Sequence, residues 1–253
     1  DLPWRNTTPW GVMVSEYMLQ QTPVNRVLPK WKEWMERWPT PQDLAKATPA
    51  QVITAWGRLG YPRRALRLHA AAQIIAEDFN NKVPEDQETL QLLPGIGEYT
   101  AAAIAAFAFE QRSLVMDVNI RRLLVRAIDG QEHPKPAPTA QEKARRLAIL
   151  PTKNAHLWAA ATMELGALVC TSKNPSCELC PIIAQCNWRK NGYPKTELVR
   201  KSQDWHGTDR KCRGTIVQAL RDNESLTESA IKKLWADESQ VEKALKTLLA
   251  DQL

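Results

Sequence analysis

Residues 90–109 read LQLLPGIGEYTAAAIAAFAF, and this stretch decides how the chain folds. Apolar residues recur at helical spacing on both sides of the tetrapeptide Pro94-Gly95-Ile96-Gly97, which interrupts them. Proline ends a helix and glycine permits a tight turn, so the stretch predicts two helices joined by a short hairpin. The glycines would also leave backbone N–H groups uncovered at the start of the second helix, which is a good seat for a phosphate.

Outside this hairpin the sequence also predicts helices, and the expected fold class is all-α. The first two-thirds of the chain shows no sustained alternation of apolar and polar residues of the kind that strands show. Thr-Pro pairs at residues 40–41 and 48–49 each mark the start of a short helix. Trp31, Trp34 and Trp38 are spaced to share one helix face, which we interpret as core packing.

Another helix is expected to begin at Asp117 and to run to about Asp129. Its inner face would carry Ile120, Leu123, Leu124 and Ile128. A proline-rich loop at residues 133–138 and two further helices would then lead to a group of cysteines.

Composition indicates more than one domain and fits a polyanionic partner. The chain has 253 residues, of which 43% are hydrophobic, enough to bury a substantial core. Lys and Arg number 34 against 28 Asp and Glu, a net charge of +6 that fits nucleic acid without requiring it. Eight basic residues gather between positions 187 and 213: Arg189, Lys190, Lys195, Arg200, Lys201, Arg210, Lys211 and Arg213. No apolar run has the length of a membrane-spanning helix and no signal peptide opens the chain, so we expect a soluble intracellular protein.

Four cysteines, Cys170, Cys177, Cys180 and Cys186, lie within seventeen residues and predict a metal site rather than a disulfide framework. Structural zinc sites usually pair two close Cys-x-x-Cys knuckles, and only one such pair occurs here. Irregular short spacings are typical of iron–sulfur ligation, so a 4Fe-4S cluster is the favoured interpretation, ahead of zinc and of thiols without a ligand. Cys212 lies outside the set and is interpreted as an ordinary small side chain.

Taken together, the hairpin, the later Asp117 and the cysteine spacing resemble the helix-hairpin-helix DNA glycosylase superfamily that includes endonuclease III. The resemblance covers about residues 1–190. Within the superfamily, LPWR at 2–5, SEYMLQQT at 15–22 and Gly60-Tyr61 are similar to the adenine DNA glycosylases of the MutY type.

This resemblance implies a helix-hairpin-helix DNA glycosylase fold with a six-helix barrel lobe and an iron–sulfur cluster lobe. The barrel lobe with the hairpin would span residues 15–108, and the cluster lobe residues 1–14 plus 109–190. A basic linker at 191–212 and a small helical C-terminal domain at 213–253 would follow. The last segment resembles the three helices of a winged-helix domain without its strands, and the chain is too short for the nucleotide-hydrolase-like C-terminal domain common in MutY-type enzymes.

Cleavage of the bond between adenine and its sugar requires a proton for the departing base and negative charge near the cationic sugar. The resemblance assigns the proton to Glu16, acting at adenine N7, and the negative charge to Asp117, held by Asn119 and a helix N-terminus. From the residues alone, Glu16 would be a solvated helix-surface acid and Asp117 a helix cap. Val118 stands where glycine is expected, and a positive φ there would strain it.

Tyr99 occupies the position where relatives with lyase activity carry the lysine that forms a Schiff base. Tyrosine cannot do that chemistry. We therefore predict a monofunctional glycosylase that leaves an abasic site, with Tyr99 hydrogen-bonded near the two carboxylates.

A second group of residues is expected to contact DNA or the flipped adenine. The resemblance assigns the wedge that fills the duplex to Gln21 with Thr22 and to Tyr61, although these could otherwise be a helix end and a core residue. Pro62 replaces a second aromatic residue expected beside Tyr61. The full set comprises Trp4, Arg5, Leu19, Gln21, Thr22, Leu59, Gly60, Tyr61, Gly95, Gly97 and Glu164.

The expected function is excision of adenine mispaired with 8-oxoguanine or guanine, by a monomer acting on double-stranded DNA in the bacterial cytoplasm, associated with the nucleoid. One alternative is an endonuclease III-like pyrimidine-damage glycosylase/lyase, against which the missing lysine at position 99 argues. The other is a non-enzymatic iron–sulfur DNA-binding sensor, which the basic linker and C-terminal helices would allow. It leaves the match at Glu16 and Asp117 unexplained.

Overall fold

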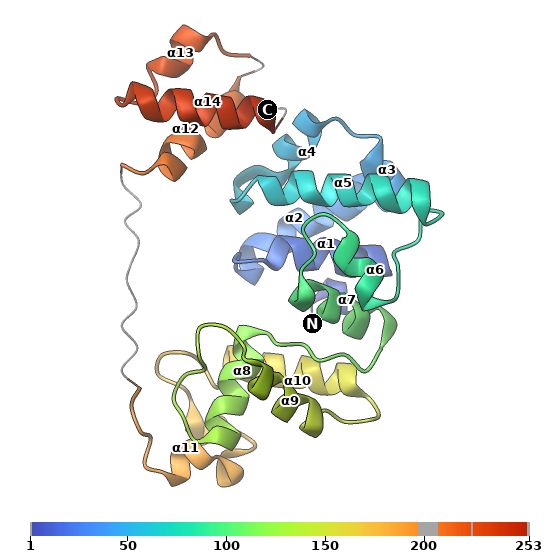
Figure 1. Ribbon diagram of the computed structural model, residues 1–253, viewed down its shortest axis with the longest axis vertical. Helices are drawn as coiled ribbons and strands as arrows, with labels where there is room; N and C mark the ends of the chain where they lie inside the picture. The colour runs from blue at the N-terminus through green and yellow to red at the C-terminus, as the bar shows by residue number, and fades with distance from the viewer. Residues whose placement is uncertain (1, 197–206, 224, 252–253) are drawn as a thin grey trace.

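The computed structural model describes residues 2–196, 207–223 and 225–251. Helices and turns make up these residues and no strand occurs among them, which confirms the all-α class. The ribbon divides into a first lobe, a second lobe beneath it and a group of C-terminal helices (Figure 1). No helix in the described part of the chain is long and apolar enough to cross a membrane.

The first lobe runs to residue 109 and holds the predicted hairpin. Its elements are η1 (Pro3–Arg5), α1 (Pro9–Leu19), α2 (Val24–Arg37), α3 (Pro41–Ala45), α4 (Pro49–Trp56), η2 (Gly57–Leu59), α5 (Arg63–Asp78), α6 (Gln87–Leu92) and α7 (Glu98–Phe109). The hairpin joins α6 to α7, as predicted. Helix α1 continues without a break across residues 14 and 15, where the sequence suggested a lobe boundary.

The second lobe, residues 110–196, contains the predicted helix after Asp117 and the cysteines. Its elements are α8 (Val118–Leu124), the π-helical turn η3 (Val125–Asp129), α9 (Ala140–Ile149), α10 (Ala155–Leu168), η4 (Cys177–Leu179), η5 (Ile183–Gln185) and α11 (Asn187–Lys190). The C-terminal helices are α12 (Asp209–Asp222), α13 (Glu228–Lys232) and α14 (Glu238–Ala250). Helix α12 begins four residues before the boundary expected at residue 213. Residues 197–206 of the predicted linker, including Arg200 and Lys201, lie outside the described residues.

Local sequence explains the first-lobe helices. Thr40 and Thr48 both form capping boxes, in which the threonine side chain accepts a backbone N–H and a side chain three residues on returns the bond. The predicted tryptophan face is buried: the rings of Trp34 and Trp38 pack edge to face 4.8 Å apart, and Trp56 joins them 5.4 Å from Trp34. This apolar core therefore anchors α2 and α4 around the site-bearing helix α1.

One predicted core residue lies elsewhere. Ile120, Leu123 and Leu124 are buried, but Ile128 is 42% exposed. A π-helical turn spaces its hydrogen bonds five residues apart instead of four, so the residues of η3 leave the face set by α8. The prediction that Ile128 lies on the inner face of this helix was therefore wrong.

Close packing joins the hairpin to α1 and α10 to α8. The hydroxyl of Tyr17 donates to the carbonyl of Pro94, and a side chain at Gly95 would come within 2.9 Å of the Tyr17 ring. At Gly166 a Cβ atom would lie 2.5 Å from the carbonyl oxygen of Asn119. These contacts fix the helices that carry Glu16 and Asp117.

Candidate active site

Glu16 lies on α1 with only 6% of its surface exposed, so the solvated-surface alternative does not describe it. Burial raises the pKa of this carboxyl to about 7, and the negative charge of Asp117 adds to the rise. A hydrogen bond from Tyr99 and the positive charge of Arg5 act in the opposite direction. An acid with this pKa still carries its proton in a large fraction of molecules at neutral pH, as a general acid requires.

Tyr99, in the first turn of α7, donates its hydroxyl to Oε2 of Glu16 over 3.4 Å. Burial, followed by the charges of Glu16 and Asp117, raises the pKa of the phenol well above its usual value. The side chain therefore stays protonated and acts as a hydrogen-bond donor.

Asp117 caps the N-terminus of α8. Its Oδ1 accepts the backbone N–H groups of Asn119 at 2.7 Å and Ile120 at 3.4 Å. Val118 follows as the first helical residue, 60% exposed, and it is absent from the residues with positive φ. Replacing the expected glycine with valine therefore introduces no backbone strain.

Arg122 is a residue that sequence reasoning missed. It is buried and donates to the side-chain oxygen of Asn119 at 2.8 Å and to the carbonyl oxygen of Cys170 at 2.7 Å, as well as to the carbonyl of Gly166. One guanidinium thus connects the helix behind Asp117 to α10 and to the start of the cysteine loop. Its position three residues after Asn119 could have predicted this contact, because residues three apart share a helix face.

The hairpin glycines differ in their surroundings. Gly95 has φ +87, a conformation that favours glycine, and it packs against Tyr17 and Arg67. Nothing lies within 4 Å of the place where a side chain at Gly97 would begin. Gly97 is also the N-cap of α7, and no side chain accepts a capping hydrogen bond from the first amides of that helix.

The predicted wedge residues sit on two adjoining turns. Gln21 is exposed with φ +56 and Tyr61 is 40% exposed with φ +48, while Thr22 and Leu59 are buried. Gly60 has φ +84, which lets the chain turn just before Tyr61.

Arg64, which sequence reasoning also missed, holds these two turns together. Its buried guanidinium donates to the hydroxyl of Thr22 at 2.8 Å and to the carbonyls of Leu59 and Gly60 at 3.3 and 3.1 Å. It also donates to the carbonyls of Tyr17 and Met18 at the end of α1. Helical spacing from buried Leu68 would have placed Arg64 on the inner face of α5.

The residues expected to line the adenine pocket divide between buried and open positions. Trp4 is buried against Trp31, and the guanidinium of Arg5 lies 5.4 Å from the ring centre of Phe107. Leu19 is half-buried at the end of α1, whereas Glu164 is exposed on α10.

The four cysteines line one small cavity of the second lobe, together with apolar residues that include Leu123 and Ile183. Burial raises the pKa values of Cys177 and Cys180, and the neighbouring cysteines add to the rise. All four thiols are free, and Cys212 is buried far along the chain in α12. Among the described residues no group of three or more His, Cys, Asp or Glu side chains is close enough to hold a single metal ion.

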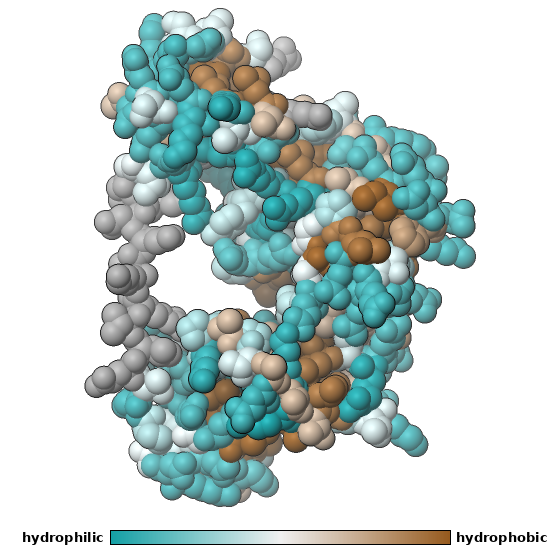
Figure 2. All heavy atoms as spheres, viewed as in Figure 1, coloured by the Kyte–Doolittle hydropathy of each residue, from teal (hydrophilic) through white to brown (hydrophobic). Residues whose placement is uncertain are grey.

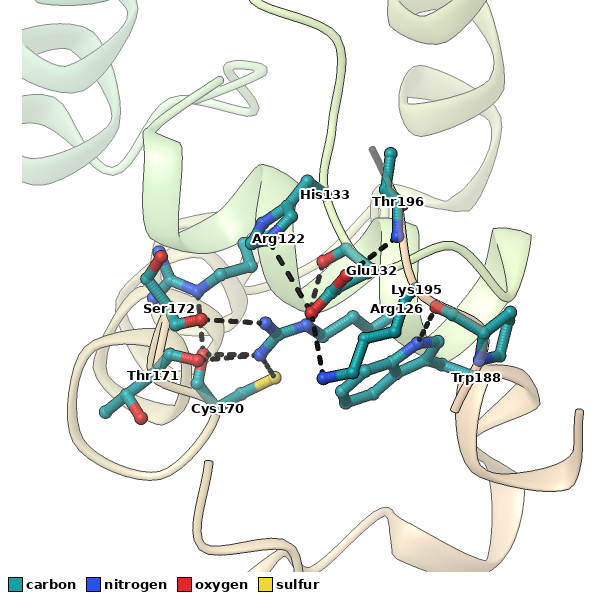
Figure 3. Close-up of polar contacts among 11 residues, drawn as sticks. Arg122, Arg126, Glu132, His133, Cys170, Thr171, Ser172, Trp188, Lys195 and Thr196 are labelled. Carbon is teal, nitrogen blue, oxygen red and sulfur yellow. Dashed lines mark hydrogen bonds and ion pairs between the residues drawn. The ribbon is translucent and has the colours of Figure 1, made fainter. Parts of the chain in front are cut away.

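Arg126 borders this cavity with 1% of its surface exposed (Figure 3). Its guanidinium contacts the sulfur of Cys170 at 3.4 Å and the carbonyl oxygen of Thr171 at 2.7 Å, and it lies 4.6 Å from the ring centre of Trp188. Its Nε donates to the carbonyl of Glu132. A buried cation therefore braces both ends of the cysteine loop, a role that the sequence did not indicate.

Comparison with known proteins identifies the family. Residues 14–148 match the family described as "HhH-GPD superfamily base excision DNA repair protein". An adenine DNA glycosylase of Mycolicibacterium smegmatis is 46% identical over 241 residues, which cover 94% of this chain and 82% of the relative. One of Mycobacterium tuberculosis is 47% identical over 240 residues, covering 93% and 79%.

Human adenine DNA glycosylase is 40% identical over 203 residues, which cover 75% of this chain and 37% of the human protein. Among solved structures, a thermostable thymine-DNA glycosylase superposes with a TM-score of 0.70 at 23% identity, covering 76% of this chain and 89% of that one. A non-covalent endonuclease III–DNA complex gives 0.65 at 20% identity, covering 75% and 88%. At these identities the two structures establish the fold alone. By its sequence and its fold, this chain belongs to the HhH-GPD superfamily of base excision DNA repair proteins and, within it, to the adenine DNA glycosylases.

Proposed function

We propose that this protein hydrolyses the N-glycosidic bond of adenine mispaired with 8-oxoguanine or guanine, acting as a monomer on double-stranded DNA. Glu16 is the general acid, and Asp117 is the carboxylate that stabilises the sugar cation. The observation that carries the proposal is the buried Glu16, whose carboxyl has its pKa raised to about 7 beside a second carboxylate. Two acids with opposed environments are the equipment that glycosidic cleavage needs.

Proton transfer from Glu16 to adenine N7 makes the base a neutral leaving group. Burial favours the protonated carboxyl, and the hydrogen bond from Tyr99 fixes its orientation. As the bond breaks, Glu16 becomes an anion close to a sugar that becomes a cation, so the new charges attract each other.

Asp117 serves the sugar and not the base. Two backbone amides at the N-terminus of α8 hold its Oδ1, at the end of the helix that carries the partial positive charge. An anion held in this way stabilises the developing cation until water attacks it. Tyr99 has no amine that could replace water, so the product is an abasic site with the strand intact.

The DNA contacts proposed here use the hairpin and the wedge. The N-terminus of α7 at Gly97 has no side-chain cap and no neighbour at the Cβ position, which suits a phosphate. The exposed Gln21 and Tyr61 suit insertion into the gap left by the flipped adenine. Trp4, Arg5, Leu19 and Glu164 complete the proposed adenine pocket. Because the proposed substrate is DNA and two relatives that cover more than nine-tenths of this chain are mycobacterial, we propose that the enzyme works in the bacterial cytoplasm at the nucleoid.

Cys170, Cys177, Cys180 and Cys186 are proposed to hold a 4Fe-4S cluster. Four free thiols on one cavity, bordered by the buried cation of Arg126, support this ligand set, because the cation offsets part of the negative charge of four thiolates. When bound, the cluster supplies structural support and no chemical step. A brown protein with about four irons per chain is the expected result; a colourless protein that contains zinc after growth in ample iron would overturn the assignment.

Single-turnover assays on duplexes with A:8-oxoguanine, A:G, A:T and an oxidised pyrimidine test the function. We expect adenine release from the first two duplexes and little from A:T. Asp117→Asn should retain binding and lose release by a factor of about 10² to 10³. A wild-type protein that releases no adenine from the A:8-oxoguanine duplex would refute the proposal.

A further inference from the structure

The C-terminal helices contact the first lobe beside the proposed wedge. The carboxylate of Asp251 accepts a hydrogen bond from Nε of Arg63 in α5 at 2.7 Å and another from Nη2 of Arg213 in α12 at 2.6 Å. One carboxylate therefore links the first lobe to the C-terminal helices. The guanidinium of Arg210 lies 4.2 Å from the ring centre of Tyr61. Helix α12 is therefore held next to a residue that the proposed function inserts into DNA.

A cleft of about 1110 Å³ separates α12 and α14 from the start of α5, and Gln21 and Tyr61 belong to its lining. The surface is hollowed between the C-terminal helices and the first lobe, and hydrophilic residues border the hollow (Figure 2). A space of this size beside exposed wedge residues can admit an extended ligand.

The charge of this cleft is strongly one-sided. Nine of its lining residues are Arg or Lys and two are Asp, an excess larger than the +6 of the whole chain. The first lobe contributes Arg58, Arg63, Arg64 and Arg67. Positive side chains gathered in this way attract polyanions, and they repel one another.

Two of these arginines illustrate the repulsion. Burial lowers the pKa of Arg221, the adjacent Asp222 raises it, and the positive charge of Arg58 lowers it further. Nε of Arg221 is buried without a hydrogen-bond partner. An anion bound in the cleft that both arginines line would relieve this repulsion.

We propose that α12, α14 and the start of α5 form a second DNA-binding wall, which holds the phosphate backbone beside the step that Gln21 and Tyr61 enter. This inference rests on the proposed function, because that function assigns the two residues to the wedge. Phosphate is the ligand class, and the backbone of the substrate duplex is the partner. The helices thereby extend the DNA interface beyond the hairpin and the active site.

The test compares two double variants of the full chain by fluorescence anisotropy. Arg210→Gln with Lys243→Gln removes two exposed charges of the cleft, whereas Lys233→Gln with Lys246→Gln removes two exposed charges of the same helical region outside it. The probe is a labelled duplex with 8-oxoguanine opposite 2′-fluoro-adenosine, which resists hydrolysis. Affinity is measured from 50 to 200 mM salt, a range chosen to resolve ion release of about 0.9 per phosphate contact.

We expect the cleft variant to lower the slope of log affinity against log salt by about 1 to 2, because Arg210 contributes one contact and Lys243 is also ion-paired with Asp209. The control variant should match the wild type. Equal slopes for both variants would overturn the inference. Failure of the proposed function would be seen in a different experiment. In that case the wild type releases no adenine, whatever the salt dependence of binding.

Discussion

The active site and the cysteine loop bury charge for opposite purposes. At the active site, Glu16 is buried near a second carboxylate, and neither burial nor Asp117 stabilises its charged form. At the cysteine loop, buried Arg126 donates to four backbone carbonyls and stacks on Trp188. Burial of Glu16 lowers the stability of the fold but keeps the carboxyl protonated for transfer. Burial of Arg126 stabilises the fold and holds the cysteine loop in place.

Replacing Glu16 gives the largest expected effect. Glu16→Gln should lower the single-turnover rate by a factor of about 10² to 10⁴, because it removes the proton donor. The same variant should be more stable than the wild type above pH 7. The folded-state pKa is raised, so the folded protein loses stability as pH rises from the unfolded pKa through about 7, and glutamine has no proton to lose.

Rates come from product release assays and stability from denaturant unfolding at pH 8. Glu36→Gln, an exposed acid of α2, is the control for both. A Glu16→Gln variant with normal activity or with lower stability at pH 8 would break the contrast with the cysteine loop.

Arg126 should behave in the reverse manner. Arg126→Met is expected to lower the free energy of unfolding by about 3 kcal/mol, because several buried carbonyls lose their donor. Iron content should fall with it, while the fraction that remains folded keeps its rate of adenine release. Arg145→Met removes an arginine of the same lobe that is 53% exposed, and it serves as the control. Equal losses of stability in the two variants would contradict a bracing role for Arg126.

Tyr99→Phe should give the smallest change, a shift in the pH dependence that Glu16 imposes on the rate. The hydrogen bond from Tyr99 lowers the pKa of Glu16, so its removal should raise that pKa. We expect the wild-type rate to fall as pH rises above about 7, and in the variant this fall should begin at a higher pH. A full pH–rate profile measures the shift. A profile that moves toward lower pH would show that Tyr99 does not donate to Glu16.

The hairpin and the early helices could be predicted because their signals are local. Proline and glycine at 94–97 and the capping threonines act on their own neighbours in sequence. The last turn of the helix after Asp117 could not be predicted in this way. Its π-helical geometry, which exposes Ile128, has no local signal comparable to a cap.

The candidate site divides along the same line. Glu16, Tyr99 and Asp117 were predicted from family motifs, and the structure brings these three side chains together from α1, α7 and the start of α8. Arg64 and Arg122 were missed because arginine is usually exposed and is buried only where remote carbonyls meet it. Those carbonyls come from segments distant in sequence, such as Gly166 and Cys170 for Arg122.

The central claim is that two carboxylates and a tyrosine hydrolyse the bond to adenine without a covalent amine intermediate. Product analysis on an A:8-oxoguanine duplex, with borohydride present to trap any Schiff base, tests it most directly. We expect free adenine, an abasic site, an intact strand before alkali and no protein–DNA adduct. Efficient strand cleavage coupled to base release, with a trapped lysine adduct, would contradict it.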